Sequence, residues 1–306
     1  MKPGIVSPDS NGAHNWNPMA FNPATGLVYF PAKTDTHALH VPDPNWKYNP
    51  DTTNVGHDEL YEGPLKAKSE ALPLPFGELV AWDPVRQRAA WRARYPVVDG
   101  GGVLATGGNL VIQGRADGVL AVYRATDGKQ LWAFDTGTGI MAPPVTYQVD
   151  GVQYVSLLAG WGGSRGLSND PSRGRMKPGY GRILTFVLGG NAVLKAPAFG
   201  HKNPPPVPAI AVDTSPRVVH QGELLYNAHC AGCHGNRAVA GPLPDLRYAS
   251  KAILEELDNI VLGGSRASAG MPSFRKILNA DQVGIIRTYI VSRARADARP
   301  AVQGPQ

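Results

Sequence analysis

The chain has 306 residues, of which 42% are hydrophobic and 18% charged, and its formal net charge is +6 at pH 7. This length is more than one compact core commonly needs, so two domains are expected. The basic excess is modest and includes no lysine- or arginine-rich run with interleaved aromatic residues, which argues against nucleic-acid binding. No apolar run is long enough to span a membrane, and the first residues contain no apolar signal segment.

Residues 1 to about 190 are predicted to form β-structure, because short apolar runs alternate there with glycine, proline and other turn residues. None of these runs has a helical period of useful length. The clearest runs are residues 26–30, 77–82, 108–112, 118–123 and 154–158.

An internal repeat links residues 81–91 with residues 121–132, since each copy begins with alanine and ends with tryptophan after a turn. The two tryptophans, Trp91 and Trp132, are 41 residues apart, which is about the length of one four-stranded propeller blade. A large flat side chain at the end of each repeat can pack against the neighbouring blade. From these residues alone, two ordinary hairpins with core tryptophans remain an equal alternative.

Residues 196–214 are predicted to form a linker between two domains. Four prolines at positions 204–206 and 208 favour an extended polyproline conformation, which makes a semi-rigid spacer. Such a spacer is expected to hold the two domains at a repeatable distance.

The only two cysteines of the chain lie in the sequence Cys-Ala-Gly-Cys-His at positions 230–234. This spacing is the attachment signature of c-type haem, in which Cys230 and Cys233 bind the two vinyl groups and His234 binds the iron. A redox-active dithiol, half of a zinc site and a chance match are the alternatives. A dithiol does not need His234, and a zinc site needs a second ligand pair at short spacing.

Met271, in the sequence Gly-Met-Pro, follows His234 by 37 residues and is the predicted second ligand of the haem iron. Its alternative role is that of a methionine filling a gap in the core. The segment Gly241–Pro242–Leu243 resembles the one in small cytochromes c, where a proline carbonyl holds the proximal imidazole.

The sequence around this signature is predicted to be helical. One helix begins at Ser215 and Pro216 and runs to Cys230, and a second covers residues 249–262. Asn279 and Gln282 form a capping-box pattern at the start of a third helix. Residues 215–297 are therefore predicted to be a small all-α cytochrome c domain, followed by a flexible tail at 298–306.

Residues 12–31, 101–111, 137–147 and 159–163 resemble the quinohaemoprotein alcohol dehydrogenases, which depend on pyrroloquinoline quinone (PQQ). The resemblance implies an eight-bladed β-propeller that holds PQQ and Ca²⁺, oxidises alcohols to aldehydes and passes electrons to haem c. By position, Asn15 and Trp16, with Gly160 and Trp161, match segments beside the quinone.

About 190 residues suffice for three to four blades. The predicted fold class is thus a multi-domain β + α protein, with a partial eight-bladed-type propeller at 1–195 followed by the all-α cytochrome c domain. In the family, the catalytic Asp, the Ca²⁺ ligands and a vicinal disulfide precede these segments. The chain is therefore expected to be a C-terminal fragment that contains no catalytic residue.

Two functions follow from the resemblance. The first is alcohol oxidation by the parent enzyme, with a copper protein, a cytochrome or a quinone-linked subunit as the electron acceptor. The second is electron transfer by a cytochrome that carries an inactive piece of propeller; a propeller scaffold without redox function is disfavoured by the haem signature. Because haem c is attached outside the cytoplasm, a periplasmic location is expected although no signal peptide is visible.

Overall fold

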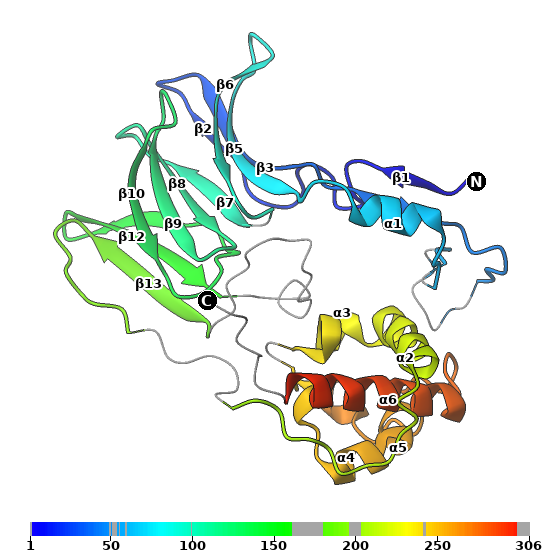
Figure 1. Cartoon of the computed structure of the whole chain (residues 1–306). Coiled ribbons are helices and arrows are strands. Elements are labelled where there is room, and N and C mark those ends of the chain that lie inside the picture. Colours follow the sequence, from blue (N-terminus) through cyan, green and yellow to red (C-terminus); the bar gives the residue numbers. More distant parts are fainter. Residues whose placement is uncertain are drawn as a thin grey trace, which may run out of the picture.

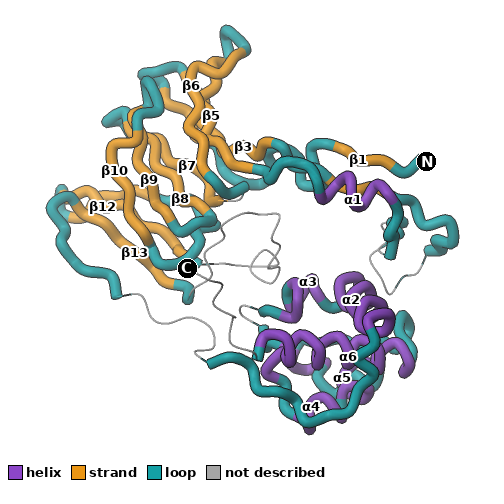
Figure 2. Tube along the Cα trace, in the orientation of Figure 1, coloured by secondary structure: helices purple, strands orange, loops and turns teal. Residues whose placement is uncertain are grey.

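The structure, a computed structural model, describes residues 2–48, 50, 54, 56–58, 60–98, 100–160, 180–195, 203–240 and 243–298. The β-sheets precede the linker and all the helices but α1 follow it, as Figures 1 and 2 show. The two parts therefore follow one another along the chain, as the sequence predicts.

The first four-stranded sheet has the order β2-β3-β5-β6 and is antiparallel throughout. Buried and less buried residues alternate along β3, the period of two expected of a strand with one face on the core. A two-stranded ribbon and a short helix lie beside this sheet. The elements are β1 (Gly4–Val6), β2 (Ala20–Asn22), β3 (Leu27–Thr34), β4 (Ala38–His40), α1 (Pro64–Glu70), β5 (Phe76–Asp83) and β6 (Arg88–Tyr95).

The second sheet is a four-stranded meander, and the third has three strands among the described residues. Each pairs its strands in chain order, as successive hairpins do. The second contains β7 (Gly100–Ala105), β8 (Leu110–Arg115), β9 (Val119–Arg124) and β10 (Gln130–Asp135), and the third contains β11 (Val145–Val149), β12 (Val152–Ala159) and β13 (Arg182–Val187). The three sheets are three blades of a partial propeller, within the predicted three to four.

Both tryptophans of the repeat contact the next sheet. The Trp91 Nε1 atom donates a hydrogen bond of 2.9 Å to the Ala125 carbonyl, in the turn between β9 and β10. A Cβ atom on Gly128 of that turn would lie 2.5 Å from the Trp91 ring. Trp132 in turn meets Phe186 of β13, with ring centroids 5.7 Å apart. The repeat therefore marks the contacts between blades, and the alternative of two ordinary hairpins with core tryptophans is wrong.

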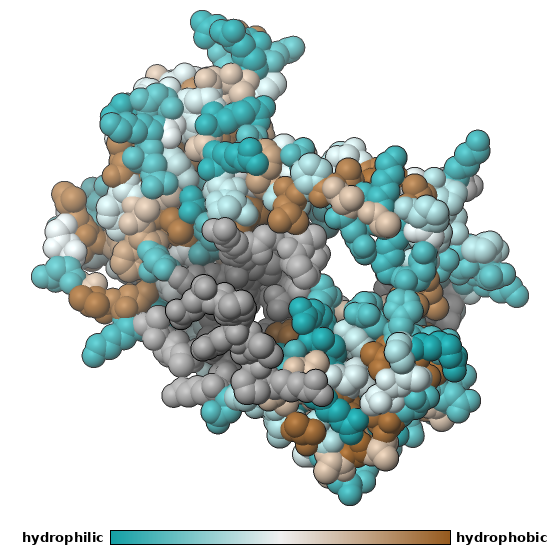
Figure 3. Space-filling model, in the orientation of Figure 1, coloured by the Kyte–Doolittle hydropathy of each residue, from teal (hydrophilic) through white to brown (hydrophobic). Residues whose placement is uncertain are grey.

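The third sheet exposes much of its apolar surface. Brown surface lies at the left edge of Figure 3, where Figure 1 places the third sheet and the segment that follows β13. The exposed apolar side chains of this sheet are Val145, Tyr147, Val149, Val152, Leu158, Ile183 and Val187. A surface of this kind is unusual on a monomeric soluble domain.

The predicted linker packs on the helical domain over the part that the structure describes. Residues 203–214 form no helix or strand, and Pro205 and Pro208 are buried at the three-residue period of a polyproline helix. Arg295 donates a hydrogen bond of 2.7 Å to the Ile210 carbonyl. The domain boundaries themselves remain a prediction, and the predicted tail lies outside the described residues from 299 onward.

The helical domain is built around the packing of α2 against α6 (Figure 1). Its core is one cluster that includes Tyr226, Leu254, Ile286 and Ile290. The helices are α2 (Pro216–His229), α3 (Ala231–His234), α4 (Lys251–Glu255), α5 (Leu257–Val261) and α6 (Ala280–Asp297), with 3₁₀ turns at Asn236–Ala238, Leu246–Tyr248 and Ala267–Ala269.

Two helix predictions have different outcomes. The capping box at Asn279 and Gln282 is present with both of its hydrogen bonds, so that prediction is confirmed. The prediction of a single helix at 249–262 is wrong, because α4 and α5 are separate helices. The backbone leaves the helical region between them at Glu256, where ψ is 4°. The buried residues Leu254 and Leu257 flank this break, so the bend keeps both side chains in the core.

Candidate functional site

The haem signature lies where α2 turns into α3. Cys230 is both the C-cap of α2 and the N-cap of α3, and its amide donates a hydrogen bond of 2.8 Å to the Tyr226 carbonyl. Cys230 is half-buried and Cys233 is exposed, and both are free thiols rather than a disulfide. The two sulfurs predicted to bind haem are thus available for thioether formation.

Burial raises the pKa of the Cys230 thiol to about 12, and the neighbouring Cys233 adds to the shift. The neutral thiol is therefore the stable form of Cys230 at neutral pH. Because oxidants attack thiolates rather than thiols, this burial protects Cys230 from oxidation before its thioether bond to haem forms.

His234 ends α3 with its imidazole held in place. Its Nδ1 atom lies 3.1 Å from the Pro244 carbonyl oxygen, so this bond leaves Nε2 available as a ligand. The sequence pointed to Pro242, and that expectation is corrected: the proline that meets the ring is two residues later. Gly241 and Pro242 lie outside the described residues.

Tyr226 fixes the turn that follows the signature. Its hydroxyl donates to the carbonyls of His234 and Gly235, at 3.1 and 2.9 Å, and burial raises the pKa of this phenol. Gly235 has φ of +71°, which favours glycine, and a Cβ atom there would lie 2.0 Å from the Val239 carbonyl. Sequence reasoning missed Tyr226, although it precedes Cys230 by four residues and so shares its helical face.

Met271 lies on the core that also contacts Cys230. Both residues are partly buried and pack against the same cluster of α2, α5 and α6 residues. Met271 follows Gly270, whose left-handed conformation (φ +90°) ends the preceding 3₁₀ turn, and its amide donates to the Arg266 carbonyl at 3.2 Å. The structure therefore brings the predicted ligand to the same core as the attachment turn.

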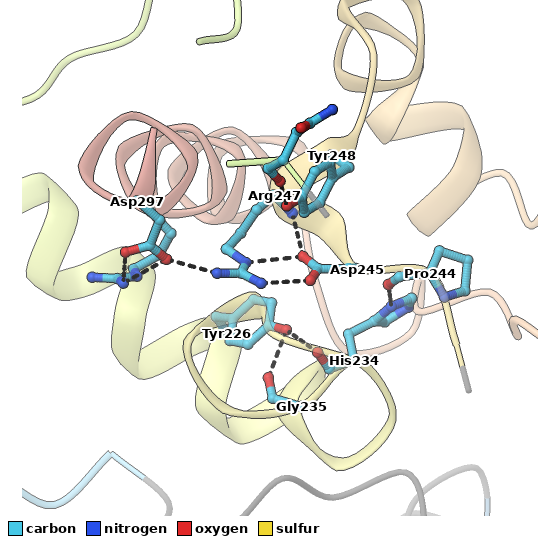
Figure 4. A network of polar contacts seen from close by, with 10 residues as sticks. Tyr226, His234, Gly235, Pro244, Asp245, Arg247, Tyr248 and Asp297 are labelled. Carbon is cyan, nitrogen blue, oxygen red and sulfur yellow. Dashed lines mark hydrogen bonds and ion pairs between the residues drawn. The ribbon is translucent and has the colours of Figure 1, made fainter. Parts of the chain in front are cut away.

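Residues 243–245 form a loop, called here the Pro244 loop, that carries the carbonyl in contact with His234. A network of ion pairs extends from this loop to α6 (Figure 4). Arg247 donates from Nε and Nη2 to the two oxygens of Asp245, at 3.0 and 2.6 Å. Its Nη1 donates to Asp297 of α6 at 3.0 Å, and Asp297 also accepts from Arg293. Sequence reasoning missed this network, because Arg247 and Asp297 are 50 residues apart.

The predicted quinone contacts flank β7 on two sides. Asn15 and Trp16 are exposed, and the Pro18 carbonyl just after them accepts a hydrogen bond of 3.0 Å from Val103 of β7. Gly160 pairs with the segment at Gly139 and Ile140, and a Cβ atom on Gly101 of β7 would lie 2.3 Å from the Ala142 carbonyl in that segment. The fourth predicted contact, Trp161, lies outside the described residues.

Asn15 and Trp16 differ in what they offer a planar cofactor. The side-chain amide nitrogen of Asn15 donates one hydrogen bond to the Asn11 carbonyl at 3.0 Å and carries a second N–H group. The Trp16 side chain is 53% exposed, which leaves a broad aromatic surface. In the part of the chain that the structure describes, no group of three or more His, Cys, Asp or Glu side chains could hold a metal ion.

Comparisons with known proteins bear on both parts of the chain. Residues 2–155 match the family model of the glucose/ethanol/alcohol dehydrogenase β-propeller domain. Residues 217–290 match the model of subunit III of cbb3-type cytochrome c oxidase. The chain belongs to the quinohaemoprotein alcohol dehydrogenase family.

Members of this family match along nearly the whole chain. The quinohaemoprotein alcohol dehydrogenase of Comamonas testosteroni is 41% identical over 96% of this chain, and one from Pseudomonas putida is 42% identical over 96%. A solved structure of a Pseudomonas putida enzyme superposes with a TM-score of 0.77 at 40% identity, covering 96% of this chain and 43% of that one. The Comamonas structure gives a TM-score of 0.71 at 38% identity, covering 98% and 43%.

The chain spans about two fifths of the length of the curated relatives it matches, 41% in both cases. A chain of this length has room for only part of an eight-bladed propeller, as its three described blades indicate. None of the helices among the described residues is long and apolar enough to cross a membrane.

Proposed function

We propose that this chain provides C-terminal blades and the haem domain of a PQQ- and haem c-dependent alcohol dehydrogenase. The substrate is a small alcohol, the product is the aldehyde, and electrons pass from the quinone to the haem. The observation that carries the proposal is the His234–Pro244 hydrogen bond beside two free signature thiols, in a chain whose described residues also form three propeller blades.

The residues of the α2–α3 turn fit a haem c. Cys230 and Cys233 would hold the porphyrin as thioethers, His234 would bind the iron through Nε2, and Met271 would bind the opposite face. A haem ligated by histidine and methionine supplies one-electron redox chemistry at a raised potential. The protein contributes the orientation of His234, through the Pro244 carbonyl, and an apolar core that excludes water from one side of the site.

Asn15 and Trp16, with Gly160 and Trp161, are the proposed contacts of the quinone. The exposed Trp16 ring can stack on a planar cofactor, and the second N–H of the Asn15 side-chain amide can donate a hydrogen bond to a quinone oxygen. The resemblance places the catalytic Asp and the Ca²⁺ ligands outside the matching segments. Alcohol oxidation is therefore assigned to the parent enzyme with a complete quinone site, rather than to residues 1–306 alone.

The proposed location is the periplasm, where haem c attachment takes place. The proposed electron acceptor is a copper protein, another cytochrome or a quinone-linked subunit.

A second function is electron transfer by a c-type cytochrome that carries an inactive piece of propeller. In this alternative the exposed apolar surface of the third sheet would stay uncovered, because no further blade would pack against it. Under this alternative the haem domain acts alone and no alcohol is oxidised.

One experiment tests the proposed haem site and asks whether this chain oxidises alcohol without the rest of the parent enzyme. The chain is produced together with periplasmic haem-attachment machinery, and its spectra are recorded with PQQ, Ca²⁺ and ethanol. Covalent haem with methionine ligation supports the haem site. Reduction by ethanol that requires PQQ supports alcohol oxidation by this chain itself, whereas no reduction supports an electron-transfer role for the separate chain. Absence of covalent haem would contradict both functions.

A further inference from the structure

We propose that Arg247 and Asp297 are positioning residues that fix the hydrogen bond of the proximal His234 through the Pro244 loop, and thereby lower the haem potential. The inference rests on the proposed haem site. It goes further by assigning a redox role to side chains that do not touch the haem signature.

The first step is the link between the loop and Arg247. Pro244, whose carbonyl meets the His234 Nδ1 atom, is followed directly by Asp245. The Asp245 carboxylate takes two parallel hydrogen bonds from the Arg247 guanidinium and a third, of 3.1 Å, from the Arg247 amide. A bidentate arginine–carboxylate pair is strong and restricts orientation, so it holds Asp245 and the adjoining peptide in one geometry.

The second step ties that pair to a rigid element. The third guanidinium nitrogen of Arg247 donates to Asp297, in the last turn of the eighteen-residue helix α6. Asp297 also accepts from Arg293, one helical turn earlier, at 2.7 Å. The side chains are largely shielded, with exposed fractions of 8% for Asp245, 17% for Arg247 and 23% for Asp297. Solvent therefore competes only weakly for these bonds.

The third step concerns the iron. A hydrogen bond from Nδ1–H to a carbonyl makes the imidazole a more basic ligand. A more basic ligand stabilises ferric over ferrous iron, which lowers the midpoint potential. If the Pro244 carbonyl moves away, the imidazole becomes a weaker donor to the iron and the potential rises. Figure 4 shows that the network continues from α6 to the loop beside His234.

The chain of contacts from Asp297 through Arg247 and Asp245 to the Pro244 carbonyl is called the relay. Arg247→Lys tests it, because lysine keeps the charge but cannot make the bidentate pair with Asp245. We expect the midpoint potential of the attached haem to rise, so that at a fixed ambient potential the ratio of reduced to oxidised haem increases by about threefold or more. We also expect the His234 Nδ1 proton of the ferrous protein to exchange with solvent about tenfold faster, because the local opening becomes easier. Asp297→Asn should change both quantities in the same direction by less.

Asp258→Asn is the matched control. It breaks the ion pair of 3.2 Å between Asp258 of α5 and Arg287 of α6. Arg287 lies on the same helix as Asp297 but outside the contacts that lead to the Pro244 loop. Potential and proton exchange should stay at the parent values in this variant.

Four outcomes are distinguished. A raised potential and faster exchange in Arg247→Lys, with the control unchanged, support the relay. A lowered melting temperature with unchanged potential and exchange overturns it, since the network would then only stabilise the fold. If Arg247→Lys does not retain haem, Asp297→Asn decides in the same way. Failure of the unmodified chain to attach haem would contradict the proposed function instead.

Discussion

Gly222 of α2 lies against Tyr289 of α6 so closely that a Cβ atom on the glycine would come within 2.8 Å of the tyrosine Cβ. The same atom would lie 2.5 Å from the Ile285 carbonyl oxygen. Both contacts involve atoms next to or within the α6 backbone, which cannot move without shifting the whole helix. The close crossing also brings Tyr289 against Tyr226, with ring centroids 5.2 Å apart. The packing that supports the attachment turn thus depends on the absence of a side chain at position 222.

Gly222→Ala is therefore expected to destabilise the helical domain by about 1–3 kcal/mol, the usual cost of forcing an extra methyl group into a packed contact. Thermal unfolding of the domain with haem attached measures it. Gly284→Ala is the control, because Gly284 lies in α6 with nothing within 4 Å of an added Cβ. That substitution should stabilise by about 0.4–1 kcal/mol, since alanine restricts the unfolded chain. Equal effects at the two positions would contradict the close crossing.

Trp91→Phe is expected to weaken the contact between the first and second blades by about 1 kcal/mol, through loss of its hydrogen bond to Ala125. The Ala125 carbonyl keeps its bond of 2.9 Å from Tyr29, so it is not left without a partner. Denaturant unfolding followed by circular dichroism gives the difference. Trp132→Phe serves as a comparison, since phenylalanine preserves an aromatic ring against Phe186 and should cost less. A larger loss at Trp132 would show that the two copies of the repeat do not act as the structure indicates.

The parts of this site that could be predicted from sequence are those set by local spacing. Cys230, Cys233 and His234 have the spacing of a haem c signature, and the Trp91–Trp132 repeat has the period of a blade. The Arg247–Asp297 pair could not be predicted, because nothing local marks two residues that meet only when α6 packs on the loop. The break at Glu256 escaped prediction since the apolar stripe continues through both short helices, and a periodic pattern does not reveal a bend between them.

Met271→Leu is expected to lower the haem midpoint potential, because the thioether that favours ferrous iron is removed while the side-chain volume is kept. The haem should remain covalently bound, as Cys230 and Cys233 are unchanged. A redox titration and the loss of the methionine-to-iron charge-transfer band measure the effect. Met141→Leu, at a buried methionine that belongs to the propeller part, should leave both unchanged. An unaltered potential in Met271→Leu would show that Met271 is a core residue and not a ligand.

Asp297 is expected to make the stability of the helical domain depend on acid pH. Burial alone would raise the pKa of this carboxyl group, but hydrogen bonds and charge from Arg247 and Arg293 outweigh burial and hold the pKa below its ordinary value. A group whose pKa is depressed by folding stabilises the native state above its unfolded pKa, which is about 3.9 for aspartate. That contribution is lost as the pH falls through the lower, folded pKa.

The measurement is the free energy of unfolding of the parent chain and of Asp297→Asn between pH 7 and pH 2. We expect the parent to be the more stable at pH 7, with a difference that stays constant down to about pH 5 and then narrows as the carboxylate takes up its proton. Asparagine has no charge to lose, so its acid limb should be flatter. A difference that does not change with pH would mean that Asp297 stabilises α6 through shape and not through its ion pairs with Arg247 and Arg293. The relay to the Pro244 loop would then lack the electrostatic link on which it depends.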